Sequence, residues 1–121
     1  MSNEVLFLEY PKCSTCKKAK KWLDEHGVSY TARHIVEDNP SADELRAWHE
    51  RGGLPLKRFF NTSGMLYREM ELSKKLPDMD EASQYALLAS DGMLVKRPLL
   101  VTAATAIPGF KEDAWMQALG L

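Results

Sequence analysis

Several features that would place this chain in a specialised class are missing from its 121 residues. Lys and Arg together number 16 and Asp and Glu 17, so there is no basic excess of the kind that favours nucleic-acid binding. No apolar run approaches the roughly 20 residues that a membrane-spanning helix needs. The N-terminus lacks the basic region, apolar stretch and small-residue cleavage site of a signal peptide. These absences predict a cytoplasmic protein with no membrane partner and no direct nucleic-acid partner.

Cysteine is also scarce, and the two cysteines, Cys13 and Cys16, share one Cys-x-x-Cys motif. Because thiols are kept reduced in the cytoplasm, such a pair is more often catalytic or redox-sensing than structural. A zinc site would need a second pair of ligands, and the only histidines, His26, His34 and His49, are too scattered to supply it. We therefore expect thiol chemistry and no metal.

The motif lies where a short strand is expected to lead into a helix. Residues Val5 to Leu8 form a continuous apolar run, which is typical of a strand covered on both faces. Residues Ser14 to His26 favour a helix that Gly27 would end. A cysteine at a helix N-terminus meets unpaired N–H groups and the positive end of the helix dipole, and both stabilise a thiolate. Cys13 is therefore the candidate nucleophile, with a buried, inert thiol as the alternative.

Cys16 lies one helical turn after Cys13, which suits a resolving thiol that attacks an adduct on the first cysteine. Lys12 and Lys17 add positive charge of the sign that favours a thiolate. The wider lysine run, from Lys17 to Lys21, has two interpretations. It is either the solvated face of an amphipathic helix or a surface that attracts an anionic substrate or an acidic partner.

The rest of the chain predicts alternating elements. A half-buried strand is expected over 28–35, a helix with a capping box over 41–50, short helices between 54 and 91, strands over 99–101 and 104–107, and a closing helix over 111–119. The order βαβ, several helices, then ββα is that of a thioredoxin-like α/β fold. It predicts a four-stranded mixed sheet with a helical insertion at about 41–91, in a single domain covering residues 1–121.

A second informative place is Arg97-Pro98, directly before the apolar run Leu99 to Val101. A proline that enters a buried strand needs an edge, a strand start or a cis bond. The arginine offers a fixed fork of donors for an oxyanion or a thiolate. A surface arginine with no such role is an equally open interpretation.

Three segments together resemble the arsenate reductase family of the thioredoxin-like superfamily. The similarity is to the glutaredoxin-linked type, which also contains the Spx and MgsR transcriptional regulators. The segments are residues 10–19 (Tyr-Pro-Lys-Cys-Ser-Thr-Cys-Lys-Lys-Ala), 60–64 (Phe-Asn-Thr-Ser-Gly) and 96–101 (Lys-Arg-Pro-Leu-Leu-Val). The resemblance implies that Cys13 attacks arsenate, that Arg97 binds the oxyanion, and that Pro98 occupies the cis-proline position facing the cysteine.

The sequence departs from the reductase pattern at two residues. Asn61 stands where reductases of this type use a further arginine, for which the neighbouring Arg58 would substitute only in part. Cys16 stands where they have no cysteine, and in this respect the chain resembles the redox-switch members and thioredoxin-linked enzymes. From the residues alone, a cap or turn before the next short helix is favoured for Asn61 over direct substrate contact.

The sequence therefore favours one function and leaves a second as the alternative. The first is a thiol oxidoreductase with Cys13, Cys16 and Arg97 as catalytic residues and a Cys13–Cys16 disulfide as its oxidised state. It would have no bound cofactor, with thioredoxin or glutaredoxin and glutathione as the reductant and arsenate as a candidate substrate. The second is a redox-switch regulator that binds the RNA polymerase α subunit. The residues expected to contact substrate are Lys12, Ser14, Thr15, Lys17, Asn61 and Pro98.

Overall fold

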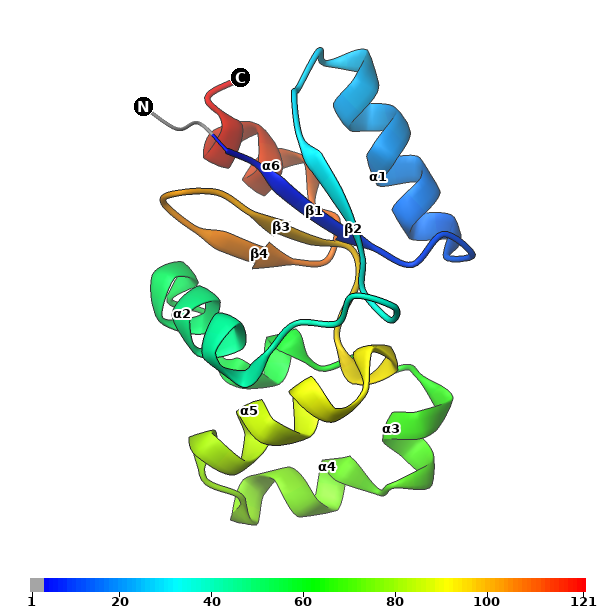
Figure 1. Ribbon diagram of the computed structural model, residues 1–121, viewed down its shortest axis with the longest axis vertical. Helices are drawn as coiled ribbons and strands as arrows, with labels where there is room; N and C mark the ends of the chain where they lie inside the picture. The colour runs from blue at the N-terminus through cyan, green and yellow to red at the C-terminus, as the bar shows by residue number, and fades with distance from the viewer. Residues whose placement is uncertain (1–3) are drawn as a thin grey trace.

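The computed structural model describes residues 4–121 and is built on a four-stranded mixed sheet with the order β2-β1-β3-β4 (Figure 1). The central strand β1 (Leu6–Glu9) runs parallel to β2 (Thr31–His34) and antiparallel to β3 (Leu99–Val101). The last strand, β4 (Ala106–Pro108), is antiparallel to β3. This is the predicted thioredoxin-like arrangement, and the fold class is confirmed.

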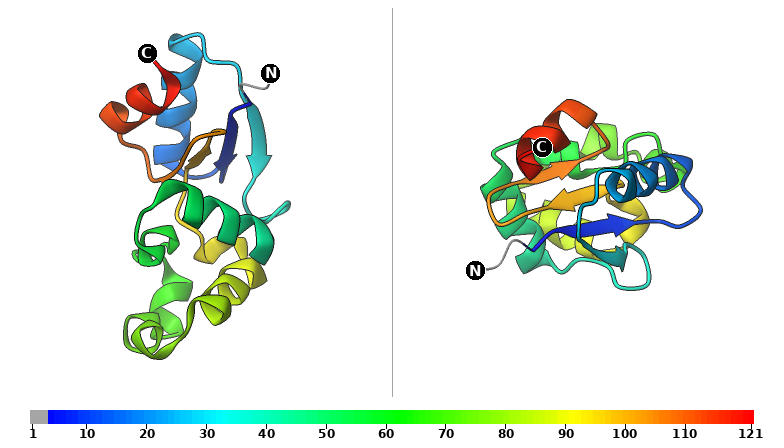
Figure 2. Two further views of the ribbon diagram at one scale, coloured as in Figure 1. Left: turned by 90° about the vertical axis from the view of Figure 1, so that its left-hand side faces the viewer. Right: turned by 90° about the horizontal axis from the view of Figure 1, so that it is seen from above.

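One face of the sheet is covered by α1 (Ser14–Glu25) and α6 (Glu112–Leu119), as Figure 2 shows. Phe7 and Leu100 of the sheet pack there against Trp22 and Trp115. Trp115 is fully buried, and its ring N–H donates a hydrogen bond of 3.1 Å to the Gly109 carbonyl, so its polar atom is satisfied. This packing fixes α1 against the end of β1 and so positions the cysteine motif.

The opposite face is covered by α2 (Ala42–Gly52), whose Leu45 and Trp48 share a core cluster with Leu8 and Leu99. The helix begins with the predicted capping box, in which the Ser41 hydroxyl and the Glu44 carboxylate each accept a backbone N–H. Since β1 sends Phe7 to one face and Leu8 to the other, it is buried on both sides, as its sequence predicted.

The insertion continues from α2 through short helices. They are η1 (Leu56–Phe59), α3 (Met65–Glu69), α4 (Leu72–Lys75), η2 (Leu76–Asp78), α5 (Glu81–Ser90) and η3 (Gly92–Leu94). An antiparallel bridge joins Phe60, directly after η1, to Val95, directly after η3. Hydrogen bonds from Asn61 N–H to the Leu94 carbonyl (2.7 Å) and from Lys96 N–H to the Phe59 carbonyl (2.8 Å) close this bridge. It places Asn61 and Arg97 at the same end of the sheet as Cys13.

Two strands begin later than predicted. Strand β2 begins at Thr31 rather than at residue 28, and as an edge strand it is largely exposed at Thr31 and Ala32. Strand β4 begins at Ala106 because residues 102–105 form a turn in which the Thr102 hydroxyl accepts backbone N–H groups. Helix α3 begins at Met65, after a turn in which Gly64 N–H donates to the Asn61 carbonyl. The edge position of β2 and the turn hydrogen bonds before β4 outweighed the local sequence pattern.

Within residues 4–121, every helix falls short of the length and apolar character that crossing a bilayer requires.

Candidate functional site

Cys13 occupies the N-cap position of α1, with an extended backbone (φ −83°, ψ 124°). Its backbone N–H donates to the Tyr10 carbonyl at 2.9 Å, and its carbonyl accepts from Lys17 N–H at 3.1 Å. The side chain makes no capping bond, so the half-buried thiol lies beside the unpaired N–H groups of the first turn. The structure thus places Cys13 at the helix start that the sequence predicted.

The environment of Cys13 favours its thiolate. Burial by itself would raise the pKa of the thiol, but four interactions outweigh it. The backbone N–H groups of Cys16 and Thr15, the Cys16 thiol and the positive charge of Arg97 together hold the pKa of Cys13 below its ordinary value. The lowered pKa provides a larger fraction of reactive thiolate at neutral pH.

Cys16 lies in the opposite kind of environment. Its side chain is fully buried, and desolvation, followed by the neighbouring Cys13, raises the pKa of the Cys16 thiol to about 12. The Tyr10 backbone N–H, 3.5 Å from the Cys16 sulfur, opposes this shift without cancelling it. The pair is therefore asymmetric: Cys13 ionises first, and Cys16 stays protonated until Cys13 has reacted.

Arg97 reaches the motif from the segment directly before β3. Its guanidinium lies 5.1 Å from the centre of the Tyr10 ring and donates to the Met93 carbonyl at 3.2 Å. These contacts hold the cation beside Cys13 while leaving other guanidinium N–H groups available. The Arg97-Pro98 peptide is cis, as the resemblance implied, and Pro98 is buried at the start of β3.

A cavity of about 580 Å³ opens between the start of α1, the turn before α3 and the segment before β3. Four predicted site residues line it: Cys13, Thr15, Asn61 and Arg97. The remaining predicted residues lie outside its lining. Lys12, Ser14 and Lys17 are exposed to solvent, and Pro98 is buried behind Arg97.

Sequence reasoning missed several lining residues, among them Lys96, Glu69, Met65 and Met93. Lys96 could have been found, because it precedes Arg97 in the same segment. Glu69 gave no signal, because only the folding of the insertion brings α3 to the cavity. Arg58 is exposed on η1 and lies outside the lining, so the cation beside Arg97 in the cavity is Lys96.

Asn61 belongs to a turn and also lines the cavity. Its carbonyl accepts Gly64 N–H in a turn, and its residue surface is only 8% exposed where it lines the cavity. A Cβ on Gly64 would come within 2.6 Å of the Asn61 side-chain nitrogen. Glycine at 64 thus leaves the space that the Asn61 amide occupies.

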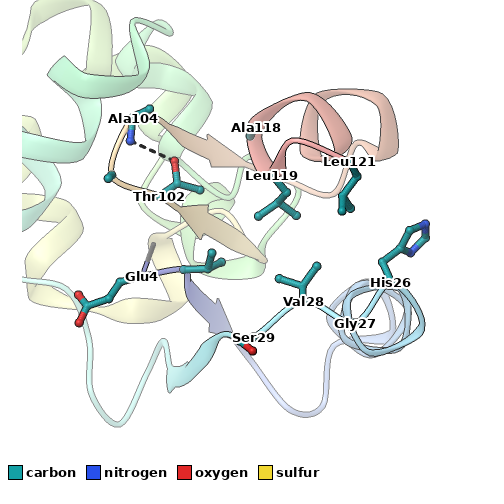
Figure 3. A pocket seen from close by; sticks show the side chains of 12 residues that line it. Glu4, His26, Gly27, Val28, Ser29, Thr102, Ala104, Ala118, Leu119 and Leu121 are labelled. Carbon is teal, nitrogen blue, oxygen red and sulfur yellow. Dashed lines mark hydrogen bonds between the residues drawn. The ribbon is translucent and has the colours of Figure 1, made fainter. Parts of the chain in front are cut away.

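A second hollow, of about 520 Å³, lies at the opposite end of the sheet, between the ends of α1 and α6 (Figure 3). Val28, Thr102 and Leu119 line it, together with Glu4 and His26, and its lining includes no cysteine. Among residues 4–121, no group of three or more His, Cys, Asp or Glu side chains is arranged to hold a metal ion. The cavity at Cys13 is therefore the candidate active site.

The sheet order and the position of the cysteine pair define a thioredoxin-like protein with two cysteines in the first turn of its first helix and at the cap before it. Residues 8–118 match the ArsC family, and the chain belongs to this family. The family assignment made from the three sequence segments is confirmed.

Three similar proteins cover nearly the whole chain. YusI, an uncharacterized protein of Bacillus subtilis (strain 168), is 58% identical over 109 residues, which cover 90% of this chain and 92% of YusI. An ArsC family related protein from Bacteroides fragilis has a crystal structure with 57% identity and a TM-score of 0.92, covering 94% and 96% of the two chains. A possible arsenate reductase from Streptococcus mutans UA159 has 45% identity and a TM-score of 0.86, with 93% and 98% covered.

Regulators of the family are more distant. The regulatory protein MgsR of Bacillus subtilis is 24% identical over 110 residues, and the global transcriptional regulator Spx of Staphylococcus haemolyticus is 28% identical over 110 residues. The match to MgsR covers 91% of this chain and 86% of MgsR, and the match to Spx covers 90% of this chain and 82% of Spx. Together these relatives support a thiol oxidoreductase-like protein or an Spx/MgsR-like regulator.

Proposed function

We propose that this protein is a thiol oxidoreductase in which Cys13 is the nucleophile and Cys16 the resolving thiol. One observation carries the proposal. The Cys13 thiol lines a cavity at the N-terminus of α1 with its pKa lowered, while the Cys16 thiol one turn later is buried with its pKa raised. Nucleophile and resolving thiol need these opposite properties, because only one of them should be ionised before the substrate arrives.

Arsenate is the first substrate to test. The Cys13 thiolate attacks arsenic and displaces one oxygen as water after that oxygen is protonated, which leaves a Cys13–S–As(V) adduct. The Cys16 thiol then loses its proton and attacks the Cys13 sulfur. The S–As electron pair passes to arsenic, so that As(V) becomes As(III) and the two thiols become one disulfide.

Arg97 is proposed to hold the negative charge of the substrate and of the Cys13 thiolate. Its planar fork of donors matches the oxygens of an oxyanion, and such charge-assisted hydrogen bonds are the stronger kind. Lys96 adds a second cation to the cavity and Glu69 a carboxylate. Asn61, in place of a further arginine, offers the oxyanion a neutral amide only.

The oxidised protein must receive two electrons before it can react again. A dithiol protein such as thioredoxin, or glutaredoxin with glutathione, supplies them by thiol–disulfide exchange at the Cys13–Cys16 disulfide. No bound cofactor takes part in this proposal.

The decisive experiment is arsenate-dependent NADPH oxidation, with the thioredoxin and the glutaredoxin/glutathione systems supplied separately. We expect turnover in the wild type, none in Cys13→Ser, and none in Cys16→Ser when glutathione is absent, because the Cys13–S–As(V) adduct then has no second thiol to reduce it. The reductant system that supports turnover identifies the reductant. Absence of a Cys13–Cys16 disulfide after peroxide or arsenate treatment, judged by peptide mapping, would refute the proposal.

A redox switch is the second candidate function. It is favoured by the similarity to Spx and MgsR and by the Tyr10 N–H contact to the Cys16 sulfur, since a disulfide would change this contact at the junction of β1 and α1. The partner proposed for this second function is the RNA polymerase α subunit. A pull-down of that subunit by the oxidised protein, and not by Cys13→Ser, is the expected result; recovery from neither redox form would exclude it.

A further inference from the structure

The exposed side of α1 carries an unusual concentration of positive charge. Residues 10–23 contain five lysines, Lys12, Lys17, Lys18, Lys20 and Lys21, and no Asp or Glu. The whole chain has a net charge of −1, so this short segment is strongly basic and the remainder carries an acidic excess. All five lysines are exposed. We call these five residues the lysine face.

The stability of the helix does not account for the lysine face. Cations in the first turns oppose the positive end of the helix dipole, and the first turn of α1 contains no acidic residue to compensate. Lys17 and Lys21, and likewise Lys18 and Lys21, stand at spacings where like charges destabilise a helix. Among these five lysines, within the described residues 4–121, Lys20 alone has an ion pair, with its ammonium 3.2 Å from the Glu9 carboxylate.

The lysine face begins beside the reactive thiol. At 1.5 Å of rise per residue, Lys17 lies about 6 Å and Lys21 about 12 Å along the helix axis from Cys13. The nearer of these distances is within the Debye length of about 8 Å at physiological ionic strength. None of the five lysines lines the cavity, where the cations are Lys96 and Arg97. The lysine face therefore extends the positive field from the thiol outward over the protein surface.

We propose that the lysine face docks an acidic protein that presents the reducing dithiol to Cys13. This inference rests on the proposed function and names how its reducing partner is recognised. An acidic protein that covers only α1 fits better than a nucleic acid, because the acidic excess of the rest of the chain would repel a polyanion that reached beyond α1. Complementary charge of this kind raises the association rate and orients the encounter.

The burial of the two cysteines determines which sulfur the docked partner attacks. Cys13 is half-buried and reachable, whereas Cys16 is fully buried. A partner thiolate attacks the Cys13 sulfur, the S–S bond breaks, and Cys16 leaves as a thiolate that takes up a proton. The partner's second thiol then attacks the mixed disulfide, which releases Cys13 and leaves the partner oxidised by two electrons.

The test compares two charge reversals of equal size in the oxidised protein. Lys18→Glu/Lys21→Glu alters the lysine face, and Lys57→Glu/Lys75→Glu alters exposed lysines of the insertion. The quantity measured is the rate of disulfide reduction by thioredoxin divided by the rate with dithiothreitol. We expect this ratio to fall about tenfold in the first variant at low salt, to recover toward wild type in about 0.5 M salt, and to stay unchanged in the second. Equal ratios in both variants and the wild type would overturn the inference.

A binding experiment separates this inference from the redox proposal. Thioredoxin is titrated into the ¹⁵N-labelled, reduced protein, and amide shifts are expected along α1 that disappear in Lys18→Glu/Lys21→Glu. If α1 shows these shifts but the Cys13–Cys16 disulfide never forms, the docking surface is supported and the proposed function is rejected. An absence of shifts on α1, or stronger shifts there with a DNA duplex than with thioredoxin at 150 mM salt, would overturn the docking surface.

Discussion

At the scale of single residues, the two thiols have opposite pKa shifts because they differ in burial and in the charged and polar groups around them. Cys13 stands at the N-cap, where N–H groups and Arg97 stabilise its anion, while the Cys16 side chain is fully buried. Desolvation dominates for the second thiol and is outweighed for the first. The same two residue types therefore acquire the separate properties of a nucleophile and a resolving thiol.

This asymmetry is measurable by alkylation with iodoacetamide as a function of pH. The rate follows the thiolate, so a lowered pKa shifts the profile for Cys13 to lower pH than that of a free cysteine. Cys16, with its pKa raised to about 12, should remain almost unlabelled up to pH 9 in the native protein. Labelling of Cys13→Ser at the rate of the wild type would contradict the assignment.

Removal of the Arg97 charge should raise the pKa of Cys13. In Arg97→Gln the guanidinium no longer favours the thiolate, so alkylation at pH 7 is expected to slow several-fold while the rate at high pH is retained. Arg58→Gln serves as the matched control, because Arg58 is exposed and lies outside the cavity lining. An identical pH profile for the two variants would remove Arg97 from the explanation.

At the scale of elements, β2 and α2 are joined by an ion pair that also belongs to a helix cap. Arg33 donates to both oxygens of Glu44, at 2.8 and 2.9 Å, and Glu44 accepts the Ser41 N–H in the capping box. The Arg33 hydrogen bonds are the largest cause that lowers the pKa of Glu44 to about 2; burial opposes this shift, and the Ser41 contacts and the Arg33 charge add to it. The edge strand is thereby attached to the helix that covers its sheet.

Glu44→Gln should lower the free energy of unfolding by about 1 kcal/mol at pH 7, a value that allows for solvent screening of a partly exposed pair. The folded pKa of about 2 lies below the ordinary 4.5, so the carboxylate stabilises the fold above pH 4.5 and loses this effect as pH falls toward 2. Urea unfolding at pH 7 and pH 3 should show the difference from wild type shrinking in acid. Glu50→Gln, on the exposed side of α2, should show no such trend.

Gly92, at the start of η3, fits against the backbone of Ile35 and Val36 with no room for a Cβ. Gly92→Ala is therefore expected to lower the free energy of unfolding by about 3 kcal/mol, because a close backbone contact must move. Gly27→Ala is the comparison: its φ of +67° is strained for alanine but the space around it is open, so about 1 kcal/mol is expected. Equal losses of unfolding free energy in the two variants would contradict the close packing at Gly92.

At the scale of the whole molecule, one sheet supplies both core clusters. Phe7 and Leu8 are neighbours in β1, yet one belongs to the layer under α1 and α6 and the other to the layer that continues into the insertion. We propose on this basis that residues 1–121 behave as a single domain. Loss of either layer would expose one face of the same strands.

Urea unfolding followed by NMR tests this proposal. The native amide signals of Leu23, on the α1 side, and Tyr85, in the insertion, are expected to disappear at the same urea concentration, as in a two-state transition. An earlier loss of the Tyr85 signal would show that the insertion unfolds as a unit of its own.

The sequence by itself determined the features that depend on neighbouring residues. The apolar run at β1, the capping box at Ser41 and Glu44, and the glycine at position 27 each act over one or two turns, so their patterns predicted the elements correctly. The position of Cys13 at a helix start follows from the same local rules. Family membership followed from three short segments and was confirmed over residues 8–118.

Only the tertiary structure decided which distant residues surround Cys13. Lys96, Glu69 and Met65 reach the cavity because the insertion folds back and closes on itself at the Phe60–Val95 bridge, a pairing across 35 residues that no local pattern encodes. The cation that lowers the pKa of Cys13 is Arg97, which folding brings beside it, rather than the lysines that are adjacent in the sequence. Electrostatic and desolvation effects depend on distance in space, and that distance is set by packing.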